Sequence, residues 1–262
     1  MREAERAVRP FVRDEGDGTP LVLLHGFGLD GTAWDDVVAR LRPGIRILRP
    51  DARGLGRSAD LPGPYTVERM ADDVVDLLDE RGLARAAIVG HSMGGVVAAD
   101  VARRAPERVA ALGLVGSRID PDTPEQERRR LALADAAERD GIGVIAAAYV
   151  PKFFAPATVA ARPELAERAL ALMRASAGPS APALFAGTVR RFDGRAVLAA
   201  LDVPVLVVTG DADGFFGVDA QRSLADAAAH ATLLVLGGVG HFAPWEAPDA
   251  VARAVEELLD RV

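Results

Sequence analysis

A serine lies between glycines in residues 90–95, which read Gly-His-Ser-Met-Gly-Gly. The serine is Ser92. The segment follows an apolar run at 87–89 and precedes a helical pattern that extends to Arg104. Glycines at 90 and 94 permit a tight strand-to-helix turn, because neither position has a side chain that would collide across it. A hydroxyl exposed on such a turn can act as a nucleophile, with free N–H groups of the helix N-terminus beneath it. The pattern predicts nucleophilic catalysis by Ser92.

Two alternating patterns predict the elements that must position this serine. Six short apolar runs predict buried strands, at 21–24, 45–48, 87–89, 112–115, 205–208 and 233–236. Helical patterns lie between them, among others at 66–81, 94–104, 217–229 and 247–259. Strands that alternate with helices form a sheet with helices on both faces. We therefore expect an α/β fold with a mostly parallel, doubly wound sheet.

The alternation is interrupted between about residue 121 and residue 200, where no run predicts a strand. This interval begins with Thr123-Pro124-Glu125-Gln126, a pattern typical of a capped helix start. Helical patterns follow at 143–150, 164–175 and 182–191. We expect residues 1–120 and 201–262 to form the core, and residues 121–200 to form an inserted helical lid over the sheet.

Five sequence blocks resemble the α/β-hydrolase superfamily, in the order in which that family carries them. They are residues 25–28 (His-Gly-Phe-Gly), 51–58 (Asp-Ala-Arg-Gly-Leu-Gly-Arg-Ser), 90–95, 210–213 (Gly-Asp-Ala-Asp) and 240–242 (Gly-His-Phe). The resemblance covers essentially the whole chain. Among the branches of the family, the chain most resembles small lid-bearing serine esterases and lactonases of the 3-oxoadipate enol-lactonase type. The resemblance implies the α/β-hydrolase fold and a Ser-His-Asp triad.

The general base is expected to be His241. In the family the acid and then the histidine follow the serine. Of the four histidines, His25 and His91 precede Ser92 or adjoin it, and His230 ends a helical pattern, where a cation is common. His241 follows the last predicted strand, at the edge of the sheet where ligands bind in open α/β folds.

The resemblance places the acid at Asp213, three residues after Gly210, where it would orient His241. Asp211 is the alternative, and its ordinary role would be to form a turn. Relatives often carry a proline shortly after the acid, whereas this chain has Gly-Phe-Phe-Gly at 214–217. The resemblance also implies an oxyanion hole made by the backbone N–H groups of Phe27 and Met93. The 51–58 block is interpreted as structural.

Several aromatic residues flank the predicted catalytic positions or lie in the lid. We expect a substrate pocket lined by Phe153, Phe154, Phe215, Phe216 and Phe242, and hence an apolar substrate. The alternatives are that the rings of the lid form a core of the lid's own and that Phe215 and Phe216 only pack beneath their loop.

These residues predict hydrolysis of a small-molecule carboxylic ester or lactone through an acyl-enzyme on Ser92. The mechanism needs no metal and no organic cofactor, so we expect none. Alternatives on the same triad are carbon–carbon bond hydrolysis and a cofactor-free perhydrolase activity. A ligand-binding protein without catalysis is a further alternative, against which the complete triad argues.

Composition narrows the range of partners. The chain has 262 residues, no cysteine and a formal net charge of −7. The missing thiols exclude a cysteine nucleophile and disulfides. The acidic balance argues against a nucleic-acid partner, and the arginines at 128–130 are interpreted as a solvated helix face. Neither a secretory signal nor a membrane span is predicted, so we expect a cytoplasmic protein. The sequence leaves a monomer and a homodimer as alternatives.

Overall fold

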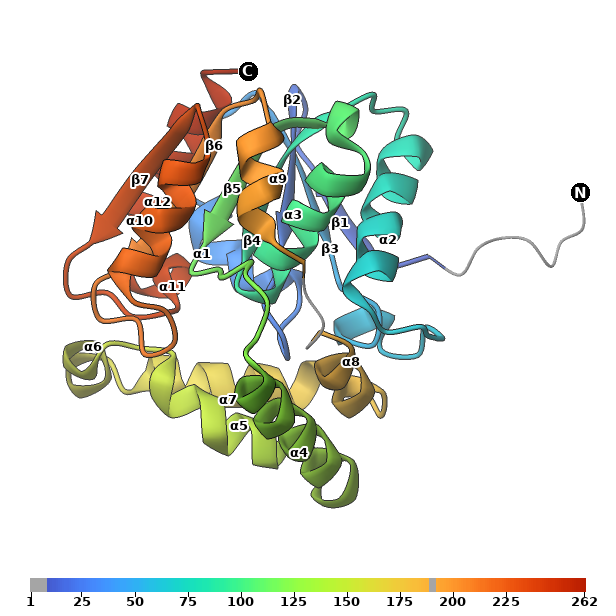
Figure 1. The fold of residues 1–262 in the computed structure, drawn as a ribbon, viewed down its shortest axis with the longest axis vertical. Coiled ribbons are helices and arrows are strands. Elements are labelled where there is room, and N and C mark those ends of the chain that lie inside the picture. Colours follow the sequence, from blue (N-terminus) through green and yellow to red (C-terminus); the bar gives the residue numbers. More distant parts are fainter. Residues whose placement is uncertain (1–8, 189–191) are drawn as a thin grey trace, which may run out of the picture.

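The computed structural model describes residues 9–188 and 192–262. A seven-stranded sheet forms its centre, with the strand order β1-β3-β2-β4-β5-β6-β7 (Figure 1). The strands are β1 (Val12–Glu15), β2 (Thr19–Leu24), β3 (Ile45–Pro50), β4 (Ala86–His91), β5 (Val109–Val115), β6 (Val205–Gly210) and β7 (Ala231–Leu236). All neighbours pair in parallel except β1, which runs antiparallel to β3. The expected mostly parallel sheet is confirmed.

Helices cover both faces of the sheet, which makes it doubly wound. Alternate residues of one strand enter different cores: Leu21 and Leu23 pack on one face, and Val22 and Leu24 on the other. The face with Val22 carries α2 (Val67–Glu80), α3 (Met93–Arg104), α9 (Gly194–Ala200) and α10 (Val218–Ala227). The opposite face carries α1 (Asp35–Val38), α11 (Ala243–Glu246) and α12 (Pro248–Leu259). Burial on both sides explains why the central strands are apolar without alternation.

A helical insert between β5 and β6 lies across one end of the sheet (Figure 1). It contains α4 (Pro124–Asp140), α5 (Gly143–Tyr149), α6 (Pro156–Ala161), α7 (Glu164–Ser176) and α8 (Ala181–Gly187). Thr123 and Gln126 form the expected capping box at the start of α4. The helix predicted at 182–191 corresponds to α8, and residues 189–191 lie outside the described residues. No helix in the described part of the chain is long and apolar enough to cross a bilayer.

The last helix of the interval 121–200 does not lie with the others. Helix α9 packs against α3 and α10 on the face of the sheet, whereas α4 to α8 lie beyond the sheet's end (Figure 1). The insert has its own apolar cluster, which includes Ile145, Phe154 and Met173 and continues into Leu29 and Trp245 of the core. This shared cluster fixes the insert onto the end of the sheet where Ser92 lies.

Candidate active site

Ser92 occupies the sharp turn between β4 and α3. Its φ of 53° and ψ of −115° make it the one non-glycine residue with positive φ among the described residues. A Cβ on Gly90 would lie 2.2 Å from the Gly94 carbonyl group, and a Cβ on Gly94 would lie 2.3 Å from the Leu24 oxygen. The chain therefore requires glycine at both positions to hold the serine in this strained conformation.

Three side chains that are far apart in the sequence form one hydrogen-bonded chain. His241 Nε2 lies 3.0 Å from Ser92 Oγ, and His241 Nδ1 lies 2.9 Å from Asp213 Oδ2. Asp213 has no exposed side-chain surface, and its Oδ1 accepts the N–H groups of Phe215 and Phe216 at 2.7 and 3.1 Å. An ionised Asp213 accepts from Nδ1–H, which leaves Nε2 free to accept the serine proton.

The alternative acid and the remaining surface histidine lie in other environments. Asp211 accepts the Gly238 N–H at 2.7 Å and so joins the segment that follows β6 to the segment that follows β7. His230 lies beyond the end of α10, where its ring nitrogen is 3.0 Å from exposed Asp202. Neither side chain bonds to the Ser92–His241 pair among the described contacts.

Backbone N–H groups beside Ser92 are available to an oxyanion. The N–H groups of Met93 and Phe27 donate to no protein acceptor within the described residues. His25 holds the Phe27 loop: its Nδ1–H donates to the Gly26 carbonyl oxygen at 2.8 Å, and its Nε2 accepts the Ala52 N–H at 2.8 Å. Burial lowers the pKa of His25, which favours the neutral ring that both bonds require.

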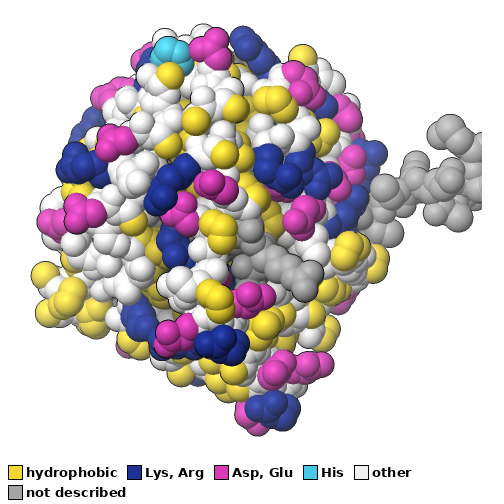
Figure 2. All heavy atoms as spheres, in the orientation of Figure 1, with side chains coloured by type: hydrophobic (Ala, Val, Ile, Leu, Met, Phe, Trp, Pro, Cys, Tyr) yellow, Lys and Arg dark blue, Asp and Glu magenta, His cyan; other side chains and the backbone are white. Residues whose placement is uncertain are grey.

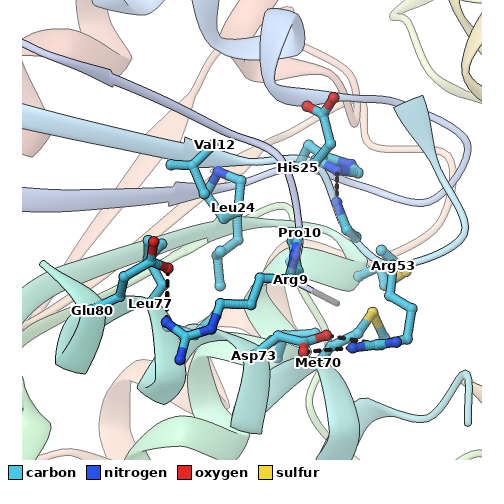
Figure 3. Close-up of a pocket in the computed structure, with 17 residues that line it drawn as sticks. Arg9, Pro10, Val12, Leu24, His25, Arg53, Met70, Asp73, Leu77 and Glu80 are labelled. Carbon is cyan, nitrogen blue, oxygen red and sulfur yellow. Dashed lines mark hydrogen bonds and ion pairs between the residues drawn. The ribbon is translucent and has the colours of Figure 1, made fainter. Parts of the chain in front are cut away.

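Figure 3 shows a second, small cavity with a volume of about 40 Å³. His25 and Met93 are among the residues that line it. The Arg53–Asp73 ion pair, 2.7 Å long and almost fully buried, lies at this cavity. In the same 51–58 segment, Asp51 accepts the N–H groups of Gly31 and Arg57. These contacts agree with the structural interpretation of that block, because its charged groups are bonded to the protein itself.

His91 is a site residue that the sequence did not indicate. Its Nε2–H donates to the backbone oxygen of His241 at 3.0 Å, and its ring lies 5.0 Å from the His241 ring. Burial, followed by the charge of nearby His241, holds the pKa of His91 well below its usual value. A neutral His91 therefore supports the loop that carries His241. The only signal in the sequence was its position next to Ser92.

Glu246 was also missed, and it joins the His241 loop to the insert. Its two carboxylate oxygens accept the N–H groups of Gly240 at 2.8 Å and of Ala155 at 3.0 Å. The Phe242 N–H donates to the Phe153 oxygen at 2.8 Å, beside these contacts. The segment that carries His241 is thus tied to the insert by several direct hydrogen bonds.

A cavity of about 750 Å³ opens above Ser92 and His241. Phe27, Phe153, Phe215 and Phe216 line it, together with Tyr149 and Phe185. The prediction that Phe154 and Phe242 also line the pocket is corrected. Both side chains are almost completely buried and pack against Trp245, with ring centroids 6.3 and 4.3 Å away. Adjacent side chains point in different directions, so Phe153 and His241 line the cavity while Phe154 and Phe242 pack in the apolar cluster between the insert and the sheet.

The arginines of α4 match the expected solvated helix face only in part. Arg128 is exposed and lies outside the cavity lining, as a solvated helix face requires. Arg129 lines the cavity, and Arg130 donates to Asp122 at 2.7 Å and to Thr188 at 2.8 Å. Residues three or four apart share a helix face, whereas adjacent residues do not, so only part of the run points to solvent.

Comparisons with known proteins agree with this fold. A family model described as alpha/beta hydrolase fold matches residues 19–248. A thermophilic esterase from Thermogutta terrifontis is 34% identical, with a TM-score of 0.90 over 95% of this chain and 92% of that chain. An enol-lactonase from Burkholderia xenovorans LB400 is 28% identical, with a TM-score of 0.86 over 95% and 96%. A 2-hydroxymuconate semialdehyde hydrolase from Pseudomonas sp. (strain CF600) is 31% identical in an alignment that covers 96% of this chain and 90% of that protein.

Proposed function

The chain belongs to the α/β-hydrolase family, and from that premise we propose that it cleaves a carboxylic ester or lactone through an acyl-enzyme on Ser92. The observation that carries the proposal is the continuous hydrogen-bonded chain from Ser92 through His241 to buried Asp213, on the floor of a substrate-sized cavity. The similarity to an esterase and an enol-lactonase supports the choice of bond.

The proposed mechanism assigns one role to each group. His241 Nε2 takes the Ser92 proton while Oγ attacks the substrate carbonyl carbon. The N–H groups of Met93 and Phe27 stabilise the negative charge that develops on the carbonyl oxygen. The imidazolium then gives its proton to the leaving alkoxide, and the C–O bond breaks. Water, activated by His241, releases the acid and restores Ser92. Asp213 remains ionised and holds the imidazole orientation.

The division of labour between core and insert is part of the proposal. We assign the catalytic groups to residues 1–120 and 201–262, and the lid to the insert 121–200. Since α9 packs on the sheet-covering helices, the covering part of this lid ends with α8. The lid supplies Tyr149, Phe153 and Phe185 to the cavity, so it would select the substrate, while the core supplies the chemistry.

Carbon–carbon bond hydrolysis is the second candidate, favoured by the 31% identical semialdehyde hydrolase. A panel of p-nitrophenyl esters, lactones and ring-cleavage products, assayed with wild type and Ser92→Ala, separates the two. Turnover of esters or lactones that depends on Ser92 supports the proposal. Turnover of ring-cleavage products alone would replace it with the second candidate. Binding without turnover of any class would leave the fold as a ligand-binding scaffold.

A further inference from the structure

Four cationic side chains line the cavity above Ser92, although the whole chain has a net charge of −7. They are Arg118, Arg129, Arg130 and Lys152. Asp122 is the one carboxylate among the described lining residues, and it is shared between Arg118 and Arg130. Among the described lining residues, four cations against one anion leave an excess of three positive charges. On the face drawn in Figure 2, by contrast, acidic and basic side chains are interspersed.

Three of these cations lie next to the aromatic rings that surround the proposed catalytic groups. The Arg118 guanidinium lies 5.8 Å from the Phe216 ring centroid, and Lys152 Nζ lies 5.9 Å from that of Phe215. These two rings lie 5.5 and 4.6 Å from the His241 ring. Each of these two charges thus lies against a ring that itself packs beside the His241 ring.

Arg130 has the same relation to the proposed oxyanion loop. Its guanidinium lies 5.2 Å from the Phe185 ring, which is 4.8 Å from the ring of Phe27. Three of the four cations therefore lie against aromatic rings that line the cavity. A substrate with its carbonyl at Ser92 and a chain of a few carbons would present its far end to this rim.

Two of the four cations are available to a ligand. Arg129 and Lys152 are exposed, and neither forms an ion pair within the described part of the chain. Arg118 and Arg130 are instead held around Asp122, whose side chain is 4% exposed. Their charges exceed that of Asp122 by one, so the pair still contributes a positive potential. An anionic substrate group could bind the exposed Arg129 and Lys152, and the ion-paired Arg118 and Arg130 would add to the positive potential around it.

We propose that this rim, formed by Arg118, Arg129, Arg130 and Lys152, binds a carboxylate of the substrate. The substrate class is then an ester or lactone with an apolar middle and a free carboxylate at the end remote from the scissile bond. This inference rests on the proposed function and narrows it. It also replaces the expectation of a wholly apolar substrate, because the apolar rings line only the centre of the cavity.

Matched substrates test the proposal. Mono-p-nitrophenyl esters of dicarboxylic acids, from succinate to suberate, are compared with their methyl-capped neutral counterparts. We expect kcat/KM to favour the anionic ester by about tenfold or more at low salt, and the preference to shrink as salt screens the rim. Equal kcat/KM within each pair at low salt, with the neutral ester hydrolysed, overturns the carboxylate site and leaves the esterase proposal intact.

Single substitutions test which residues cause the preference for the anionic ester. Arg129→Gln and Lys152→Gln should each reduce the preference, by about threefold to tenfold, and leave kcat/KM for the neutral ester within about twofold. Arg128→Gln is the matched control, since Arg128 is one position away on the same helix and lies outside the cavity lining. A preference that survives the Arg129 and Lys152 double variant, or falls equally in Arg128→Gln, overturns the assignment.

Binding without turnover keeps the two proposals separate. Ser92→Ala is titrated calorimetrically with glutaric acid monoanilide and with neutral pentananilide. The carboxylate site predicts tighter binding of the monoanilide, and predicts that this difference disappears in the background of Lys152→Gln and Arg129→Gln. Equal affinity for the two anilides overturns the carboxylate site, whether or not any ester is turned over. A lack of ester turnover, by itself, contradicts only the proposed function.

Discussion

His241 Nε2 lies 3.0 Å from the hydroxyl oxygen of Ser92, although 149 residues separate the two in the sequence. The serine is fixed by the backbone of the β4–α3 turn. The histidine is held by Asp213 at its other nitrogen, by His91 at its backbone oxygen, and by Glu246 through the preceding Gly240. Since a reacting pair must stay aligned, these supports outside the pair are part of the catalytic apparatus that we propose.

The acid assignment predicts unequal effects of two neighbouring substitutions. Asp213→Asn should lower kcat by roughly 10⁴-fold, because an amide in place of the carboxylate favours the wrong His241 tautomer. Asp211→Asn is the matched control: its carboxylate only accepts the Gly238 N–H, so activity should stay within about threefold. Steady-state kinetics on one ester checks both. A larger loss in Asp211→Asn would assign the acid to Asp211.

Phe153 and Phe154 are adjacent but should respond differently to truncation. Phe153 lines the cavity, so Phe153→Ala should lower kcat/KM for bulky acyl groups by roughly tenfold to a hundredfold and affect acetyl esters little. Phe154 packs on Trp245, so Phe154→Ala should lower stability by about 3–5 kcal/mol. Kinetics on a small and a large ester, with urea unfolding, separates these effects. The same size preference in both variants would contradict the assignment.

Glu246→Gln should lower kcat, because Glu246 holds the backbone of the segment that carries His241. The amide nitrogen cannot accept either N–H, so one of the bonds to Gly240 and Ala155 is lost. We expect kcat to fall by about tenfold to a hundredfold through a displaced His241. Glu256→Gln is the control, because Glu256 also accepts a backbone N–H, that of Arg42, on the exposed surface. Rates are normalised to the fraction that a fluorophosphonate titrates. An unchanged kcat per titrated site would leave Glu246 with only a structural role.

Acid should destabilise the fold through two buried histidines. Burial lowers the pKa of His25 and, more strongly, that of His91, from the ordinary value of 6.5. Below that value the unfolded chain binds protons that the folded chain does not, so the free energy of unfolding falls as pH falls. Each such group contributes up to about 1.4 kcal/mol per pH unit to this slope on the acidic side of 6.5 while its folded form stays unprotonated, and His91 contributes over the wider pH range.

Urea unfolding between about pH 7 and pH 5 checks this slope, in a range where ordinary carboxylates remain largely ionised. His91→Gln should reduce the slope by at least half, since it removes the group whose pKa is lowered more. A free energy of unfolding that does not change across this range would show that the folded chain takes up these protons as readily as the unfolded one.

Elements dominated by local pattern were predictable. The apolar runs located β2 to β7, because strands buried on both faces need such runs, and Thr123 with Gln126 marked the start of α4. Strand β1 has the sequence Val-Arg-Asp-Glu and was missed. It is defined by antiparallel pairing of Val12 with Pro50 and its neighbours, not by its own hydrophobicity. Helices α6 and α9, with six and seven residues, were missed, whereas α5 and α8, with seven residues each, were found, so the helical period is not decisive at this length.

Contacts between distant segments were not predictable. Glu246 meets Ala155 across 91 residues, and no spacing rule connects them. The cavity rim combines Arg118 after β5, Arg129 on α4 and Lys152 after α5, which only the folded insert brings to one opening. Phe154 and Phe242 resembled pocket residues by position, and the direction of their side chains was decided by Trp245.

Covalent trapping tests the central claim most directly. Wild-type protein is mixed with a p-nitrophenyl ester that it turns over, quenched in acid within the first turnover, and examined by intact-mass and peptide mass spectrometry. The account predicts one acyl group per chain, located on Ser92, and none in Ser92→Ala, whose rate should be lower by about 10⁴- to 10⁶-fold. An acyl group on another residue, or turnover by Ser92→Ala within about tenfold of wild type, would contradict it.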